Sequence, residues 1–186
     1  TIVVPDQATP EELQSAMTVG AGFGNLASKI MQLSTVTESQ LTKEIQAANH
    51  IIFVGKSSSF NEMNALELPA PVSSSGFAAA GSSADDGVIQ MIVSPWNQSK
   101  VVLVVSGSSD AAVIKAAQAI STGLIRPSYK PNLAVVANVI SQPVPVAVPV
   151  EQTLADLGYG KDGLSDKMTK PGTASSLFYF YVPPGL

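Results

Sequence analysis

Residues 50–55 read HIIFVG, a short apolar run that ends at a glycine. The four residues at positions 51–54 are all apolar, without the polar alternation of a half-exposed strand. Such a run is typical of a central strand that is buried on both faces of a parallel sheet. Parallel sheets form where strands alternate with helices along the chain, so the segments on either side of this run decide the fold.

The segments before this run predict two strands and two helices. Residues 1–4 are β-rich, and residues 9–12 (TPEE) supply an N-cap hydroxyl, a proline at the first helical position and a glutamate three residues after the cap. Residues 33–36 are expected to form a short strand. The capping-box pattern TESQ at residues 37–40 predicts a second, shorter helix. Helical spacing predicts a buried face on the first helix that comprises Leu13, Ala16, Met17, Gly20, Phe23, Ala27, Ile30 and Met31.

The chain after Gly55 begins with a long connection and then returns to regular structure. Residues 55–87 are rich in Ser, Pro, Gly and Ala, which indicates a loop with one helical turn near residues 60–66. Residues 88–93 and 101–105 are two strands, and the stretch between them is too short for a parallel crossover. They are therefore expected to form an antiparallel hairpin in a mixed sheet.

One further helix and one further strand complete the domain. The helix starts at Asp110, carries apolar residues at helical spacing, and ends where Gly123 is placed as the C-terminal cap. Residues 133–140 supply the last strand. Strands and helices in this order predict a doubly wound α/β domain with a mostly parallel, mixed sheet.

The end of the chain is expected to belong to another module. Prolines at positions 143, 145 and 149 indicate an extended linker, because proline cannot continue a central strand. Residues 175–182 form a strand with apolar residues on both faces, which is typical of a β-sandwich. We therefore assign residues 1–146 to the α/β domain and residues 147–186 to a linker and a partial β-sandwich.

Composition excludes several classes of function. The net charge is −4 and the ten Lys and Arg residues are scattered, so no basic stripe is available for nucleic acid. The absence of Cys excludes disulfides, thiolate metal sites and cysteine nucleophiles, and it fits an extracytoplasmic protein. Apolar runs are all shorter than the roughly 18 residues that span a bilayer.

Motifs for phosphate or dinucleotide binding are incomplete. Gly55-Lys56-Ser57 matches the end of a P-loop, but His50 stands where the motif needs its first glycine. Gly20, Gly22 and Gly24 have the wrong spacing for a dinucleotide fingerprint and lie inside a helical pattern, where close helix packing explains them. Residues 106–110 (SGSSD) could hold an anion at a helix N-terminus, although the carboxylate of Asp110 favours simple capping. No cofactor is therefore expected.

Catalytic and metal sites are not predicted either. His50 is the only histidine, and no G-x-S-x-G turn offers it a serine. The acidic pairs Asp85/Asp86 and Asp162/Asp166 could bind Ca²⁺ weakly, but neither has the dense oxygen ligands of an EF-hand, and solvated turns explain them.

Aromatic residues are the candidates for recognition. Trp96 is the only tryptophan and lies at a hairpin tip between Pro95 and Asn97, where it could stack on a sugar or a partner protein, or pack over the sheet edge. Three tail tyrosines could form a similar carbohydrate or partner surface, or a core: Tyr159, Tyr179 and Tyr181.

Residues 87–120, GVIQMIVSPWNQSKVVLVVSGSSDAAVIKAAQAI, resemble the family of bacterial cellulose synthase regulatory subunits. In that family a Pro-Trp-Asn turn precedes a strand that ends in Ser-Gly and a helix. The tail is similar to the start of the family's next β-sandwich, through LGY at residues 157–159, Gly172-Thr173 and FYFYVPPG at residues 178–185. The resemblance covers about half of the chain, and the strand HIIFVG adds to it.

The resemblance implies a flavodoxin-like three-layer domain followed by a carbohydrate-binding-like sandwich. It also implies a non-catalytic, extracytoplasmic (periplasmic or cell-surface) scaffold that supports the catalytic cellulose synthase subunit and guides the emerging β-1,4-glucan. Neighbouring domains of the same polypeptide would be further partners, and the membrane tether would be an anchor helix outside this chain.

Flavin does not follow from the fold, since the loop at residues 6–10 offers few free N–H donors. Two alternatives stay open. One is an extracytoplasmic hydrolase that uses the loop at residues 55–87 and serine-rich turns around His50. The other is a small-ligand-binding α/β domain.

Overall fold

The computed structural model describes residues 1–27, 31–73, 76–79, 82–123 and 125–139. Contacts divide the chain into two compact units, Thr1–Gln142 and Pro143–Leu186. The second unit lies outside the described residues, as do the predicted tail strand and partial sandwich. The domain boundary near residue 146 stays a prediction.

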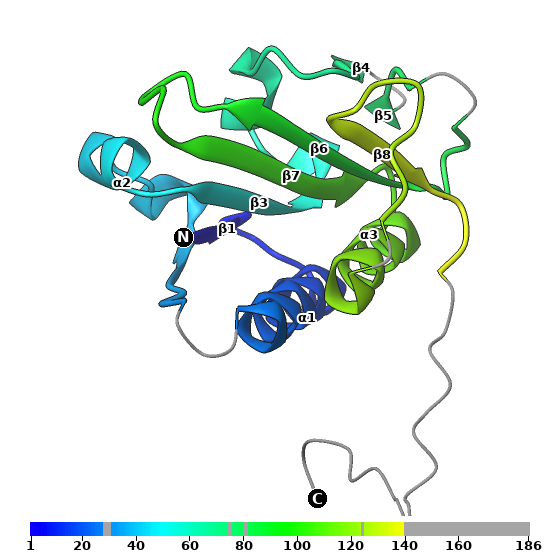
Figure 1. Ribbon diagram of the computed structural model, residues 1–186, viewed down its shortest axis with the longest axis horizontal. Coiled ribbons are helices and arrows are strands. Elements are labelled where there is room, and N and C mark those ends of the chain that lie inside the picture. The colour runs from blue at the N-terminus through cyan, green and yellow to red at the C-terminus, as the bar shows by residue number, and fades with distance from the viewer. Residues whose placement is uncertain (28–30, 74–75, 80–81, 124, 140–186) are drawn as a thin grey trace, which may run out of the picture. The chain divides into compact units, whose positions relative to one another are not determined.

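Six strands form one mixed sheet in the order β2-β1-β3-β7-β6-β8 (Figure 1). Strands β2, β1, β3 and β7 are parallel to one another, whereas β6 is antiparallel to both β7 and β8. The strand predicted from HIIFVG lies inside this sheet, between β1 and β7. The strands are β1 (Ile2–Val4), β2 (Thr35–Thr37), β3 (Ile51–Lys56), β6 (Gly87–Val93), β7 (Val101–Gly107) and β8 (Leu133–Val136).

This topology confirms the predicted flavodoxin-like α/β fold, including the antiparallel hairpin of β6 and β7. The first strand pairs with the second on one side and the third on the other, which is the doubly wound order. Two predicted strands are shorter or shifted: β2 covers Thr35–Thr37 rather than residues 33–36, and β8 ends at Val136.

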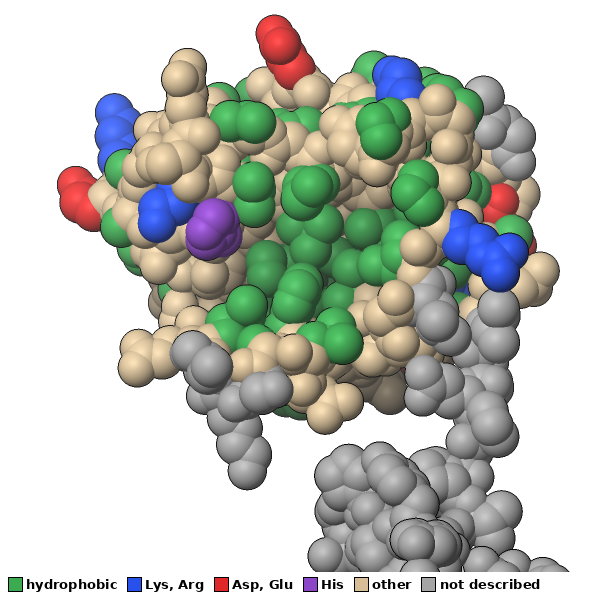
Figure 2. All heavy atoms as spheres, in the orientation of Figure 1, with side chains coloured by type: hydrophobic (Ala, Val, Ile, Leu, Met, Phe, Trp, Pro, Cys, Tyr) green, Lys and Arg blue, Asp and Glu red, His purple; other side chains and the backbone are tan. Residues whose placement is uncertain are grey.

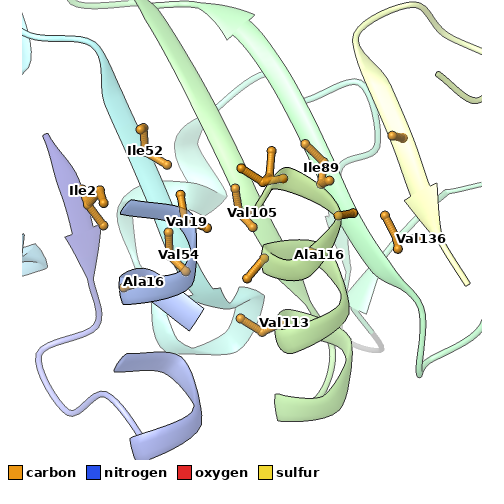
Figure 3. Close-up of a cluster of buried hydrophobic side chains, with 14 of the residues drawn as sticks. Ile2, Ala16, Val19, Ile52, Val54, Ile89, Val105, Val113, Ala116 and Val136 are labelled. Carbon is orange, nitrogen blue, oxygen red and sulfur yellow. The ribbon is translucent and has the colours of Figure 1, made fainter. Parts of the chain in front are cut away.

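Helices α1 (Pro10–Leu26) and α3 (Asp110–Thr122) cover one face of the sheet (Figure 1). Both begin as predicted, α1 with a complete Thr9–Glu12 capping box and α3 with Ser109 as N-cap, and Gly123 caps α3 in the left-handed conformation. Figure 3 shows the core between this helical layer and the strands. Its members include Ile2, Val19, Ile52, Val54, Ile89, Val105, Val113, Ala116 and Val136.

The predicted buried face of α1 is partly wrong. Met17 is 74% exposed and Leu13 is 43% exposed. The reason is the close approach of α1 to α3: a Cβ on Gly22 would lie 2.6 Å from the Cα of Ser121. The face that turns inward therefore carries smaller or polar residues, namely Glu12, Ser15, Ala16, Val19 and Gly22.

The second face of the sheet is covered by the short helix α2 (Lys43–Ala48) and by the long connection after β3. The capping box expected to open α2 instead opens a 3₁₀ turn, η1 (Glu38–Gln40), and Thr42 caps α2. The connection contains the expected helical turn, η3 (Glu62–Ala65), together with η2 (Ser57–Ser59) and the two short paired strands β4 (Val72–Ser73) and β5 (Gly76–Phe77).

A buried amide fastens this connection to the sheet. Gln90 of β6 is fully buried, and its side chain accepts a hydrogen bond from the N–H of Ala70 at 2.6 Å and donates one to the carbonyl of Ala70 at 3.1 Å. Both polar groups of Ala70 are thereby paired, as buried backbone requires.

We predict that Gln90→Met lowers the free energy of unfolding by about 1–3 kcal/mol, because it leaves two buried backbone groups of Ala70 unpaired. Urea unfolding measures the loss. The control is Met91→Gln at the next position, which is exposed and should change stability by less than about 0.5 kcal/mol. Equal stability of the two variants would contradict the anchoring role of Gln90.

Gly55, which ends the HIIFVG run, is required by its backbone and its neighbours. Its φ is +155°, and a Cβ at this position would lie 2.9 Å from ring atoms of both Phe60 and Pro5.

We predict that Gly55→Ala destabilises the domain by about 2 kcal/mol or more. Gly24→Ala in α1, where a Cβ meets nothing within 4 Å, should instead stabilise it by up to about 1 kcal/mol. Thermal and urea unfolding of both variants test the contrast.

Candidate functional site

The crevice at the carboxyl ends of the strands is the expected ligand site of this fold. In open α/β sheets ligands bind there, where the strand order reverses. In this chain the reversal lies between β1 and β3. The loops that follow β1 and β3 meet the N-terminus of α1 at this point, and the N-terminus of α3 lies beside them.

Glu12 lies in this crevice and is completely buried. Its Oε2 accepts a hydrogen bond from the N–H of Thr9 at 2.8 Å. Its Oε1 accepts two more, from the N–H of Lys56 at 2.8 Å and from the hydroxyl of Ser59 at 3.2 Å. The carboxylate thus joins the loops after β1 and β3.

A second carboxylate, on Asp110 at the start of α3, completes the network. Asp110 Oδ1 accepts a hydrogen bond from the Thr9 hydroxyl at 3.0 Å and pairs with Lys56 Nζ at 2.8 Å. This hydrogen bond to Lys56 lowers the pKa of Asp110, and the same contact raises the pKa of Lys56. The polar groups of this crevice are therefore arranged to satisfy one another.

The sequence identified parts of this network and missed the whole. Thr9 and Glu12 form the expected capping box of α1, and Asp110 lies in the first turn of α3, next to its N-cap Ser109. The contacts of Glu12 with Lys56 and Ser59 join residues 44 and 47 positions apart, and no local pattern encodes them. A capping glutamate on the inward face of α1 was the only available signal.

His50 lies at the opposite end of the sheet. Its Nδ1 accepts a hydrogen bond from the N–H of Val101 at 3.1 Å, which ties the start of β7 to the residue before β3. Ser57, Ser59 and Ser109 lie beyond the other ends of β3 and β7, about 20 Å away at the rise of a six-residue strand. The structure does not bring His50 and these serines together, contrary to what the hydrolase alternative needs.

The Pro95-Trp96-Asn97 turn also lies at the end with His50. Trp96 is half-buried and packs against the core of the second sheet face, while Pro95 is exposed. The Asn97 side chain donates a hydrogen bond to the carbonyl of Ala47 at 2.7 Å, so the turn is fastened to α2. Part of the indole remains available for contact. The other recognition candidates, Tyr159, Tyr179 and Tyr181, lie outside the described residues.

An apolar hollow of about 300 Å³ opens between the sheet and the end of α1 (Figure 2). His50, purple in Figure 2, lies at its border, and none of the described residues that line the hollow is Asp, Glu, Lys or Arg. It is therefore suited to apolar contact rather than to ion binding. Its apolar lining includes Phe23, Met31, Leu33, Ile52, Met91 and Leu103.

The acidic pairs give no cation site in the described part of the chain. Asp86 accepts a hydrogen bond from the N–H of Ser83, which is an ordinary turn contact, and Asp162 and Asp166 lie outside the described residues. Over the residues that the structure describes, no three His, Asp or Glu side chains gather as metal ligands. No helix among them has the length and apolar character to cross a membrane.

The Lys56–Asp110 pair predicts a pH-dependent contribution to stability. Because the pKa of Asp110 is lower in the folded protein, the contribution is complete above the ordinary Asp value of about 3.9 and is lost as pH falls through the lower folded pKa. The pair is partly exposed, so Asp110→Asn should cost only about 0.5–1 kcal/mol at pH 7. Urea unfolding from pH 7 to pH 2 should show that the difference in free energy of unfolding between wild type and Asp110→Asn vanishes at low pH. Asp85→Asn, at an exposed position, is the control. A difference that stays constant with pH would refute the assignment.

Comparison with known proteins identifies the family. Residues 1–132 match the family model described as cellulose synthase BcsB, first FD domain. Among curated proteins, no match is found. The matched region contains β1 to β7, α3, the crevice of Glu12 and the Trp96 turn, so it covers most of the described domain. The chain therefore belongs to the cellulose synthase BcsB family, the regulatory subunit of cellulose synthase.

Proposed function

We propose that this chain is a non-catalytic, extracytoplasmic scaffold domain of a cellulose synthase complex. In this role it supports the catalytic synthase subunit, contacts neighbouring domains of its own polypeptide, and helps to guide the emerging β-1,4-glucan. The match to the first FD domain of BcsB over residues 1–132 is the observation that carries the proposal.

The geometry of the strand-end crevice supports a scaffold over an enzyme or a small-ligand receptor. Function depends on the site and not on the fold, and here the polar groups of the expected site bind one another. Glu12 and Asp110 take the donors of Thr9, Lys56 and Ser59. A substrate would have to displace these contacts before it could bind.

The Pro95-Trp96-Asn97 turn is the proposed contact for glucan or for a partner domain. An indole that is anchored on one side and partly exposed on the other can stack on the apolar face of a sugar ring. The hydrogen bond from Asn97 to Ala47 holds the turn in place, which lowers the entropic cost of binding.

We predict that cello-oligosaccharides change the fluorescence of Trp96, the only tryptophan, in a saturable way at millimolar concentration. Malto-oligosaccharides of equal length are the matched control, since they differ only in linkage, and they should have a smaller effect. No change with cello-oligosaccharides would remove direct glucan contact at this turn.

The scaffold role has a separate test in the complete synthase complex. Trp96→Ala should reduce glucan synthesis by membranes while the protein still co-purifies with the catalytic subunit. Tyr129→Ala replaces an exposed aromatic residue of the described domain and should leave synthesis unchanged. If Trp96→Ala and Tyr129→Ala give the same synthesis as wild type, this turn does not serve the complex.

A further inference from the structure

In flavodoxin itself FMN binds at the switch point of the sheet, which in this chain lies between β1 and β3. A phosphate group is held there by free backbone N–H groups at the N-terminus of the helix that follows the first strand. The residues of this chain can therefore be tested for their fit to such a group.

The first turn of α1 has few donors to offer. Pro10 has no N–H, and the N–H groups of Glu12 and Leu13 donate to the hydroxyl and the carbonyl of Thr9. The N–H of Thr9 itself donates to Glu12 Oε2. The N–H groups of Thr9, Glu12 and Leu13 are thus engaged within the helix cap.

The carboxylate of Glu12 has the surroundings of a bound anion. It is fully buried and accepts hydrogen bonds from three donors on two loops: the N–H groups of Thr9 and Lys56 and the hydroxyl of Ser59. Charge-assisted hydrogen bonds of this kind are what a protein normally supplies to a phosphate or carboxylate ligand. A second anion in the same crevice would meet the repulsion of a buried negative charge.

The nearby lysine is also engaged. The N–H of Lys56 contacts the Glu12 carboxylate, whereas its Nζ pairs with Asp110 at 2.8 Å. The Thr9 hydroxyl donates to the same Asp110 oxygen. The residues present do not fit a flavin phosphate.

We propose that Glu12 is an internal anion that takes the place of a flavin phosphate in this crevice and ties the loops after β1 and β3 together. The crevice is a closed structural joint rather than a vacant cofactor site. The loops that a ligand would order in a flavin-binding relative are ordered here by a side chain of the protein itself.

Chemical rescue tests this proposal on the full 186-residue chain. Glu12→Ala removes the carboxylate and should lower the unfolding midpoint by about 5 °C or more, since it leaves buried donors unpaired. Sodium formate, a small carboxylate that fits the vacated space, should restore part of this loss compared with sodium chloride of equal ionic strength. Wild type should show the same midpoint in both salts and should not quench the fluorescence of FMN.

Glu11→Ala is the matched control, because Glu11 is the adjacent glutamate on the same turn and is exposed. It should shift the midpoint by no more than about 1–2 °C and should not respond to formate. If Glu12→Ala is too unstable to isolate, its refolding yield in formate is compared with its yield in chloride. Glu12→Gln keeps the shape of the side chain without the charge, and it should unfold at a lower temperature than wild type.

Four results would overturn the proposal. Saturable binding of FMN to wild type would show that the crevice is open. A Glu12→Ala midpoint equal to that of Glu11→Ala, or a Glu12→Gln midpoint equal to that of wild type, would show that the buried charge does not hold the loops. Equal effects of formate and chloride on Glu12→Ala would show that no anion position exists.

Discussion

The buried carboxylate of Glu12 is the contact on which the arrangement of the strand ends depends. It lies on the first turn of α1, yet two of its three donors belong to Lys56 and Ser59, at the end of β3 and in the turn that follows. A buried charge is costly to desolvate and stabilises a fold only when its hydrogen bonds are complete. Both oxygens of Glu12 accept hydrogen bonds. Gly55 lets the chain turn closely past Pro5 and Phe60, which brings the N–H of Lys56 to the carboxylate.

The two ends of the sheet therefore differ in chemistry. The carboxyl ends of the parallel strands carry the charged network of Glu12, Lys56 and Asp110. The amino ends of β3 and β7 carry His50, the Trp96 turn and the apolar hollow, with no charged side chain among the described residues of the hollow. Contacts that exclude water are thus favoured at the end opposite to the one where this fold usually binds a ligand.

The sequence predicted several of the elements that local rules determine. The run HIIFVG, the caps at Thr9 and Gly123 and the short link between β6 and β7 each depend on neighbouring residues, and each was predicted correctly. The inward face of α1 was not, because it depends on how closely α3 approaches at Gly22. For the same reason the crevice was predicted only as helix caps: the partners of Glu12 are set by strand order, which brings distant residues together.

An internal anion has a consequence that a bound ligand does not share. A ligand stabilises the folded state by an amount that rises with its free concentration, so a ligand-ordered domain loosens when the ligand is scarce. A carboxylate that belongs to the chain is present at every concentration of solutes, so its contribution does not depend on the supply of a ligand. Such a domain keeps its shape without a ligand, as the proposed scaffold role requires. The filled crevice is in this respect a physical argument for a scaffold, independent of the family match.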